Sequence, residues 1–163
     1  IYSTIQAYYA IAGNFESKSS YHPYTKPVIL GILVCIFIEI IIGTEIRGGL
    51  DMSRKENPLI EGVILLKMLG PFKYMHTILG LSLLGLTVYL RKIVNDIKFI
   101  SSSFMVNSVN FMMGLLITQI ILGEALVFLE VKPLMQLCHM WFSSLLVGLS
   151  VASFTFYKIS IQK

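Results

Sequence analysis

Four long apolar segments dominate the pattern of hydrophobic and polar positions along the chain. They cover roughly residues 27–46, 71–92, 104–129 and 133–157. Each is long enough to cross a bilayer as an α-helix, which takes about 20 residues. Polar stretches separate the segments, so the pattern predicts an all-α membrane protein whose four helices run up, down, up and down across the bilayer.

Residues 1–26 precede these spans. Their apolar beginning is too short to cross a membrane, and no basic region or cleavage site of a signal peptide comes before it. We therefore expect the end of a preceding helix, a cytoplasmic linker with a solvated His22, and then one transmembrane domain over residues 27–163. The chain is expected to be part of a longer protein.

The longest polar loop is expected at residues 47–70. It contains the pairs Gly48-Gly49 and Asn57-Pro58, which favour a break in helical structure. Its later part, residues 61–69, predicts a short amphipathic helix on the membrane surface. The connection at 130–133 is short, which predicts that the last two spans form an antiparallel hairpin.

The composition agrees with a lipid environment. The 163 residues are 55% hydrophobic and 13% charged, whereas soluble domains are nearer ~25% charged. The net charge of +4 fits loops that face anionic lipid. No basic cluster interleaved with aromatic residues occurs, so we expect no nucleic-acid partner. Cys35 and Cys138 lie inside apolar segments, which favours buried thiols over a disulfide.

The distribution of basic residues predicts how the bundle is oriented. One side carries seven basic and two acidic residues, namely Lys18, Lys26, Arg91, Lys92, Lys98, Lys158 and Lys163 with Glu16 and Asp96. The loops of the other side carry Arg47, Arg54, Lys55, Lys67, Lys73 and Lys132, offset by Glu45, Asp51, Glu56, Glu61 and Glu130. We therefore expect both ends of the chain on the cytoplasmic side.

Two histidines lie near the starts of the second and fourth spans. His76 and His139 follow Pro71 and Pro133, each a good first helical residue. At 1.5 Å per residue, both rings lie roughly 7–9 Å into their helices. Because the second and fourth spans run in the same direction, the two rings are expected at nearly the same depth, in the outer half of the bundle.

Two imidazoles at one depth on facing helices can bind the iron of a porphyrin from both sides. Their nitrogens must then be roughly 4 Å apart. The alternative is that His76 and His139 only pack or hydrogen-bond a neighbour, but ionisable groups inside a membrane are functional by default. Zinc is less suitable, because no third histidine or thiolate cluster is placed to help.

Other polar residues lie inside the spans. Glu39 is in the first span, where a carboxylate costs a few kcal/mol or is held protonated. We expect it in the same half as the histidines, with a function of its own or with a hydrogen bond to a neighbouring helix. The third span carries Asn107, Asn110, Gln119 and Glu124, which suit interhelical hydrogen bonds.

Two sets of residues near the histidines are expected to accommodate a macrocycle: small residues that leave room for it, and apolar residues that line its site. The small residues are Gly80, Gly85, Ser143, Ser144 and Gly148. The soft apolar lining is expected from Met75, Phe111, Met112, Met113, Met140 and Trp141.

Three strings resemble the second half of the haem A synthases of bacteria and mitochondria. IEIIIGTEIRGGLD (38–51) resembles their QIxLGTQVRxxxD segment. HTILGLSLLGLTVYL (76–90) is similar to the family's sixth helix, which opens on a haem-ligand histidine. GEALVFLEVKPLMQLCH (123–139) is similar to the hairpin that ends in Gln-x-x-His. The resemblance extends from about residue 27 to the end of the chain.

The resemblance implies one four-helix half of a pseudo-symmetric eight-helix enzyme. That half holds a b-type haem (iron protoporphyrin IX) with His76 and His139 as axial ligands. The enzyme oxidises the C8 methyl of haem O to the formyl of haem A for cytochrome oxidase. Catalysis would lie in an N-terminal half outside this chain, in an equivalent subunit or in a second copy. Haem O synthase and cytochrome oxidase assembly are implied partners, in a bacterial plasma membrane or a mitochondrial inner membrane.

The chain departs from the family pattern at several positions. Thr77 follows His76 where arginine is frequent, so Arg47 or Lys73 is expected to pair with the haem propionates. Glutamates stand at 39 and 45 where glutamines are common, and Glu39 is the one candidate for a catalytic role within this chain. Two alternatives stay open: a stand-alone di-histidine b-type cytochrome that transfers electrons, and a structural membrane subunit whose histidines pack.

Overall fold

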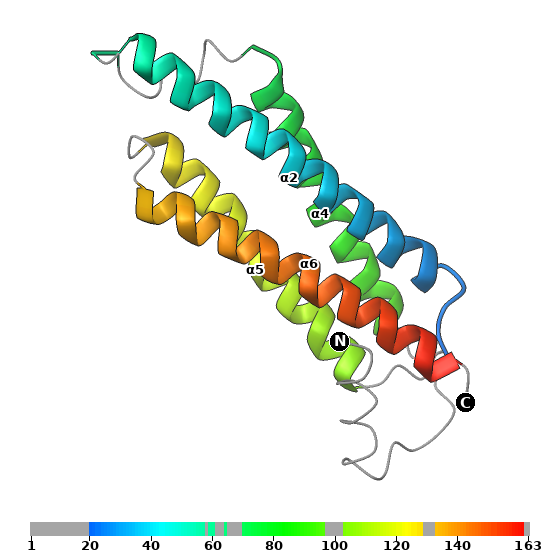
Figure 1. Ribbon diagram of the computed structural model, residues 1–163. Helices are drawn as coiled ribbons and strands as arrows, with labels where there is room; N and C mark the ends of the chain where they lie inside the picture. Colours follow the sequence, from blue (N-terminus) through cyan, green and yellow to red (C-terminus); the bar gives the residue numbers. More distant parts are fainter. Residues whose placement is uncertain are drawn as a thin grey trace.

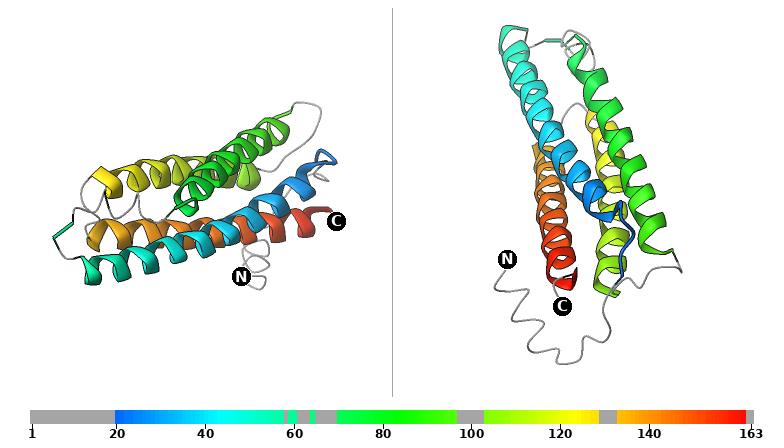
Figure 2. Two further views of the ribbon diagram at one scale, coloured as in Figure 1. Left: turned by 90° about the horizontal axis from the view of Figure 1, so that it is seen from above. Right: turned by 90° about the vertical axis from the view of Figure 1, so that its right-hand side faces the viewer.

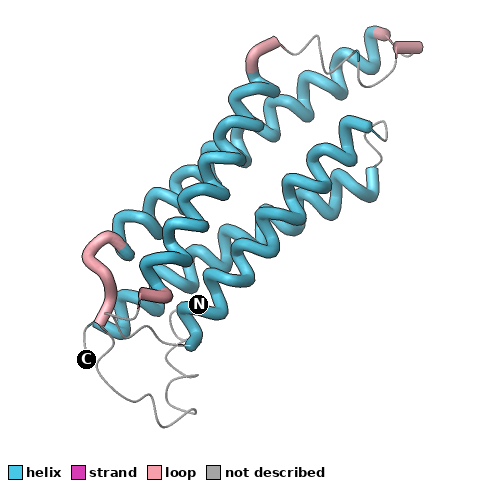
Figure 3. The backbone as a smooth tube through the Cα atoms, turned by 180° about the vertical axis from the view of Figure 1, so that it is seen from behind, coloured by secondary structure: helices cyan, strands magenta, loops and turns pink. Residues whose placement is uncertain are grey.

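Four helices make up almost all of the part of the chain that the structure describes. The computed structural model describes residues 20–57, 59–60, 64, 70–96, 103–128 and 133–161. The helices are α2 (Thr25–Glu56), α4 (Phe72–Val94), α5 (Ser103–Phe128) and α6 (Pro133–Ile161) (Figures 1 and 3). Each is long and apolar enough to cross a membrane, and no strand occurs among these residues. The predicted all-α bundle of four membrane-spanning helices is confirmed.

The helices form a four-cornered bundle in which neighbours run antiparallel. α2 packs against α4 and α6, and α5 packs against the same two helices (Figure 2). One diagonal of the bundle is therefore made by α2 and α5, and the other by α4 and α6. The two helices of each diagonal run in the same direction, because they are separated by one antiparallel helix along the chain.

The interior of the bundle is lined by stripes that alternate steps of three and four residues. In α2 the stripe runs through Ile29, Ile32 and Ile36 and continues through Glu39 and Gly43, all of them buried or half-buried. This spacing keeps one seam of a helix facing its neighbours when the helices cross at a small angle, as in coiled coils. Glu39 therefore points into the bundle because it continues a stripe that begins with isoleucines.

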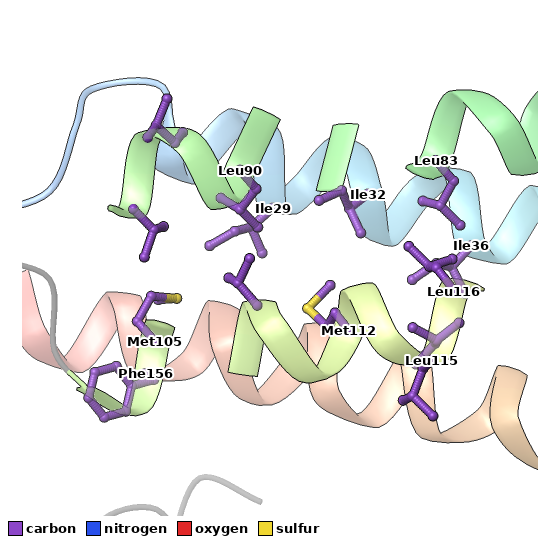
Figure 4. Packing of buried hydrophobic residues seen from close by; sticks show 14 residues of the cluster. Ile29, Ile32, Ile36, Leu83, Leu90, Met105, Met112, Leu115, Leu116 and Phe156 are labelled. Carbon is purple, nitrogen blue, oxygen red and sulfur yellow. The ribbon is translucent and has the colours of Figure 1, made fainter. Parts of the chain in front are cut away.

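Buried hydrophobic residues are concentrated in one half of the bundle. We call this the packed half: residues 25–36 of α2, 83–94 of α4, 103–116 of α5 and 146–161 of α6. It contains all the buried members of the main cluster, among them Ile32, Leu90, Met112 and Phe156 (Figure 4). The other half we call the histidine half: residues 37–56, 72–82, 117–128 and 133–145 of the same helices. It lies at the upper left of Figure 1.

The first helix is longer than its hydropathy predicted. The apolar span was expected to end at residue 46 and a loop to begin at 47, but α2 continues to Glu56. The helix has 32 residues and is about 48 Å long, against about 30 Å of bilayer hydrocarbon. The predicted break at Gly48 is wrong, because Leu50 packs against Ile46 and Leu126 and holds this polar end as helix. Each glycine in a helix costs only about 1 kcal/mol relative to alanine.

Asn57 does end the helix, as expected from its sequence. Its backbone N–H and its side-chain amide both donate to the carbonyl of Ser53. The other three helices begin within one residue of their predicted starts, and α6 extends to Ile161, beyond the expected end at residue 157. The expected surface helix at 61–69, the connection at 130–132 and most of the linker before residue 20 lie outside the described residues.

Candidate functional site

A layer of polar and small side chains occupies the interior of the histidine half. Its members continue the inward stripes of the four helices and are buried or half-buried: Glu39, Gly43, His76, Gly80, Gln119, Gly123, His139 and Ser143. The main hydrophobic cluster borders this layer on one side. A small cluster of Leu50 with Ile46, Ile60 and Leu126 borders it on the other. We call it the polar layer.

His76 pairs with Glu39 across the contact between α4 and α2. The His76 Nδ1 atom and the Glu39 Oε2 atom lie within ion-pair distance of each other, and neither meets hydrogen-bond geometry with any described residue. The Glu39 side chain is 13% exposed and that of His76 is 33% exposed. Glu39 thus contacts a histidine of the neighbouring helix, and its place in the same half as the histidines is confirmed. The expected interhelical hydrogen bond of Glu39 stays a prediction.

Two glycines lie against this pair. A Cβ added at Gly80 would lie 2.9 Å from the Glu39 Oε1 atom, which is closer than real Cβ contacts come. A Cβ added at Gly43 would lie 3.4 Å from the His76 Cε1 atom. The α2–α4 contact is therefore shaped around one carboxylate and one imidazole.

His139 is held in a different way, through its backbone. Its carbonyl accepts hydrogen bonds from the Gln119 side-chain amide at 2.7 Å and from the Ser143 hydroxyl at 3.0 Å. The Gln119 amide also contacts the Ser143 oxygen at 2.6 Å. The His139 Nδ1 atom is buried and has no hydrogen-bond partner in the described part of the chain. A Cβ at Gly123 would lie 3.8 Å from the ring's Cε1 atom.

The two imidazoles belong to the helices of one diagonal, at matching levels. Leu83 and Leu146, each seven residues after its histidine, are both buried in the main cluster. Because neighbouring helices run antiparallel, the Arg91–Asn110 bond places His76 level with about residue 125 of α5, and His139 contacts Gln119 and Gly123 of the same helix. The predicted equal depth of His76 and His139 agrees with this placement.

Several residues expected near the histidines lie elsewhere. Of the small residues, Gly80 and Ser143 face the interior, but Gly85, Ser144 and Gly148 are exposed. Of the expected lining, Met112 lies in the core of the packed half, and four others lie on the outer surface: Met75, Phe111, Met140 and Trp141. These residues are near the histidines in sequence. They do not belong to the inward-facing stripes of the histidine half, so their side chains lie elsewhere.

Of the four polar residues expected to bond between helices in α5, two do so. Gln119 makes the interhelical hydrogen bonds expected of it, and the Asn110 Oδ1 atom accepts a bond of 2.9 Å from the Arg91 Nε atom of α4. Asn107 and Glu124 are exposed. Glu45 of α2 is exposed as well.

The far end of the histidine half carries a basic side chain that joins α2 to α6. The Arg47 Nη1 atom lies 2.9 Å from the Met140 sulfur, next to His139 in sequence. Its Nε atom lies 3.9 Å from the Asp51 carboxylate, one turn farther along α2. Lys73 lies one turn before His76, with its ammonium 4.8 Å from the Tyr74 ring centre.

The polar layer contains a repeat that hydropathy alone does not reveal. Glu39-Ile-Ile-Ile-Gly43 in α2 and Gln119-Ile-Ile-Leu-Gly123 in α5 are nearly the same string, and each glycine lies beside the histidine of the following helix. The α2–α4 hairpin therefore corresponds to the α5–α6 hairpin. Similarity between these two strings is the signal in the sequence that points to Gly43 and Gly123, which we did not predict as site residues.

The donors of the polar layer fit a haem. Two imidazoles on facing helices of one diagonal suit bis-histidine iron ligation. The glycines beside each ring keep side chains away from the ring edges. A bare metal ion fits less well, since no group of three or more His, Cys, Asp or Glu side chains is placed to hold one in the described ranges. Cys35 and Cys138 are free thiols, half-buried in the bundle.

Comparisons with known proteins add no further constraint. A scan against protein-family models, a search of curated proteins and a search of solved structures return no match to this chain. Functional inference therefore rests on the polar layer itself and on the sequence motifs that run through it.

Proposed function

We propose that the chain binds a b-type haem between His76 and His139 and serves as the cofactor half of a haem A synthase. When bound, such a haem supplies a one-electron Fe(II)/Fe(III) couple. The chain's own residues would hold it: the two imidazoles as axial ligands, and the polar layer as the surroundings of those imidazoles. The resemblance of residues 27–163 to the second half of that family supports the more specific part of the proposal.

The observation that carries the proposal is the diagonal placement of the two histidines at one level of the bundle. Adjacent helices would bring two imidazoles side by side, whereas helices of one diagonal place them on opposite sides of the interior. The second arrangement would leave room between the imidazoles for an iron held by both. The bundle provides it in the half whose interior stripes carry glycine, serine and glutamine in place of large apolar residues.

A role in packing alone accounts poorly for these side chains. A buried polar atom without a partner costs roughly 1–3 kcal/mol, so buried ring nitrogens are usually hydrogen-bonded. The His139 Nδ1 atom has no such bond among the described residues. A histidine kept only for helix contacts could be replaced by leucine or phenylalanine, which suit a lipid-embedded interior better.

Arg47 is the residue we assign to the haem propionates. It bridges α2 and α6 through Met140, so its guanidinium lies at the end of the histidine half and next to His139 in sequence. Guanidinium groups bind carboxylates with paired hydrogen bonds, which a lysine ammonium cannot do. Lys73, whose ammonium lies over Tyr74, is the other cation that we expected to pair with the propionates.

The proposal assigns no oxidation of haem O to this chain by itself. The family resemblance places that reaction in a separate half, and Glu39 is committed to His76. This half would pass electrons or stabilise the enzyme. A stand-alone b-type cytochrome would use the same two ligands but would take no part in the conversion of haem O. The longer protein of a haem A synthase should carry a Glu-x-x-His upstream and convert haem O to haem A in membranes.

The first experiment is a pyridine haemochrome spectrum of the purified protein, with ferric and ferrous absorption spectra. Wild type should contain b-type haem with a low-spin bis-imidazole spectrum. His76→Ala or His139→Ala should abolish that spectrum while leaving the helix content measured by circular dichroism nearly unchanged. His22→Ala is the matched control, because His22 lies before α2 and should not affect haem. A single ligand variant with an unaltered bis-imidazole spectrum would disprove the ligand assignment.

A further inference from the structure

Glu39 differs from every other acidic residue of the four described helices. Glu45, Asp51, Glu56 and Glu124 are exposed, whereas Glu39 is not. A carboxylate inside a membrane protein is costly and needs a compensating partner. Its partner is the Nδ1 atom of His76.

We propose that Glu39 is a positioning residue that orients the His76 imidazole and makes it the stronger of the two haem ligands. The carboxylate accepts the proton on Nδ1, so the lone pair on Nε2 is available to the iron. This role rests on the proposed haem site. Glutamate rather than a neutral residue at this position sets the reduction potential of the site.

The tautomer follows from the pairing. A neutral imidazole has one N–H and one lone pair, and only the lone pair can bind a metal. If the carboxylate accepts at Nδ1, then Nε2 is the free donor. If Glu39 instead donated a proton to Nδ1, the ring hydrogen would be on Nε2 and the ring could not bind iron through it. Metal-bound histidines usually pair their second nitrogen with a carboxylate or carbonyl, which fixes the ring and raises its basicity.

The helix contact is built to hold this carboxylate. An alanine Cβ at position 80 would lie 2.9 Å from the Glu39 Oε1 atom, so the carboxylate would have to shift there. Glycine at position 43 lies against the edge of the His76 ring. Both glycines therefore leave the carboxylate and the imidazole in contact without a displaced side chain.

The corresponding position in the other hairpin shows what the carboxylate adds. Gln119 takes the place of Glu39 in the repeat, and its amide donates to the His139 carbonyl instead of contacting the ring. The His139 Nδ1 atom is left without a partner in the described part of the bundle. The two ligands are therefore unequal, and His76 is the one with a charged acceptor behind it. Hydrogen bonding to an axial ligand is one of the means by which proteins tune haem potentials.

The test is the haem midpoint potential of Glu39→Gln in the full chain. The amide keeps an oxygen that can accept from Nδ1 but removes the charge. Haem content and the low-spin spectrum should be retained, and the midpoint potential should rise. A tenfold loss of preference for ferric over ferrous iron corresponds to about 59 mV for a one-electron couple. Glu45→Gln, the same chemical change at an exposed site of the same helix, should leave the potential unchanged.

A second pair of variants displaces the carboxylate without altering it. Gly80→Ala places a methyl group against the Glu39 Oε1 atom, whereas Gly85→Ala meets no atom within 4 Å. The first should raise the potential and shift the g-values of the ferric electron paramagnetic resonance spectrum, and the second should do neither.

The outcomes separate this role from the haem site itself. If wild type has bis-imidazole haem but Glu39→Gln and Gly80→Ala match their controls in potential and g-values, the positioning role is wrong and the haem site stands. If wild type lacks low-spin haem, the site itself is wrong and Glu39 has no ligand to orient.

Discussion

The two halves of the bundle are built from the same four helices but filled in opposite ways. In the packed half the inward stripes carry isoleucine, leucine, methionine and phenylalanine, and they form one continuous cluster. In the histidine half the same stripes carry Glu39, Gly43, His76, Gly80 and their counterparts in the second hairpin. Helix geometry is uniform along the bundle, so only the identity of the stripe residues distinguishes the halves.

This difference indicates that the packed half stabilises the bundle and that the histidine half carries the candidate site. Lipid is as apolar as a leucine side chain, so helices in a membrane associate through close packing and interhelical hydrogen bonds. The packed half supplies the close packing and determines how the helices are aligned. Because the same helices continue into the histidine half, they are aligned there in the same way. The polar groups of that half would not by themselves determine one alignment of the helices.

Haem binding is expected to produce the largest change in the free energy of unfolding. The added protection should be confined to the histidine half. A ligand at a free concentration a thousand times its Kd stabilises the protein by about 4 kcal/mol. Thermal unfolding in detergent should show that gain when haem is added to haem-free protein. Hydrogen exchange should locate it, with slower exchange in residues 37–56 and 134–145 and little change in residues 25–36. Equal protection of both halves would contradict the division.

Leu90→Ala should be the most damaging substitution of a single apolar residue in α4. Leu90 is fully buried in the packed half, and truncation leaves a cavity. In soluble cores such changes cost about 2–5 kcal/mol, and the lower figure applies here because the unfolded reference is also in an apolar medium.

Leu81→Ala on the same helix is the matched control, because Leu81 is exposed in the histidine half. Its free energy of unfolding should stay within about 0.5 kcal/mol of wild type. Equal losses in the two variants would show that burial in the packed half does not govern stability.

Ser143→Ala tests how the polar layer holds His139. The change removes the hydroxyl that bonds both the His139 carbonyl and the Gln119 amide. We expect a loss of about 1 kcal/mol in the free energy of unfolding, the size typical of a hydrogen bond. Ser144→Ala is the control, since that exposed hydroxyl bonds the carbonyl of Met140 in its own helix. If the two variants unfold alike, the Gln119 network contributes nothing measurable.

Gly48→Ala should have the smallest effect, and it should stabilise. Gly48 lies inside α2 and an added Cβ would meet no atom within 4 Å, so alanine should gain about 0.5–1 kcal/mol. Gly70→Ala should have the opposite sign, because Gly70 has a φ of 66° and a side chain there is strained. Urea or thermal unfolding of both variants would check the two signs. A destabilised Gly48→Ala would mean that the end of α2 is not helical in solution.

Local signals predicted most of the fold. Long apolar segments determine four helices because a backbone in lipid must satisfy its own hydrogen bonds. Asn57 ended α2 as expected. The error at Gly48 arose because the packing of Leu50 against Leu126, a contact between segments far apart in the chain, outweighs a weak local preference.

The candidate site was predicted in part. His76 and His139 could be recognised because their depth follows from position along a helix. Their lining could not, since Met112 faces the core of the packed half while Trp141 faces outward. A shift of one residue turns a side chain by about 100° around the helix, so which residues surround a ring depends on how each helix is rotated against its neighbours.

The sequence by itself determined the four apolar helices and the equal depth of two histidines, because both follow from the spacing of residues along one chain direction. Only the tertiary structure decided that α4 and α6 share a diagonal, that Glu39 pairs with His76 and that Gln119 supports His139. Those relations depend on the rotation and pairing of helices, which are set by the summed packing of side chains distant in sequence.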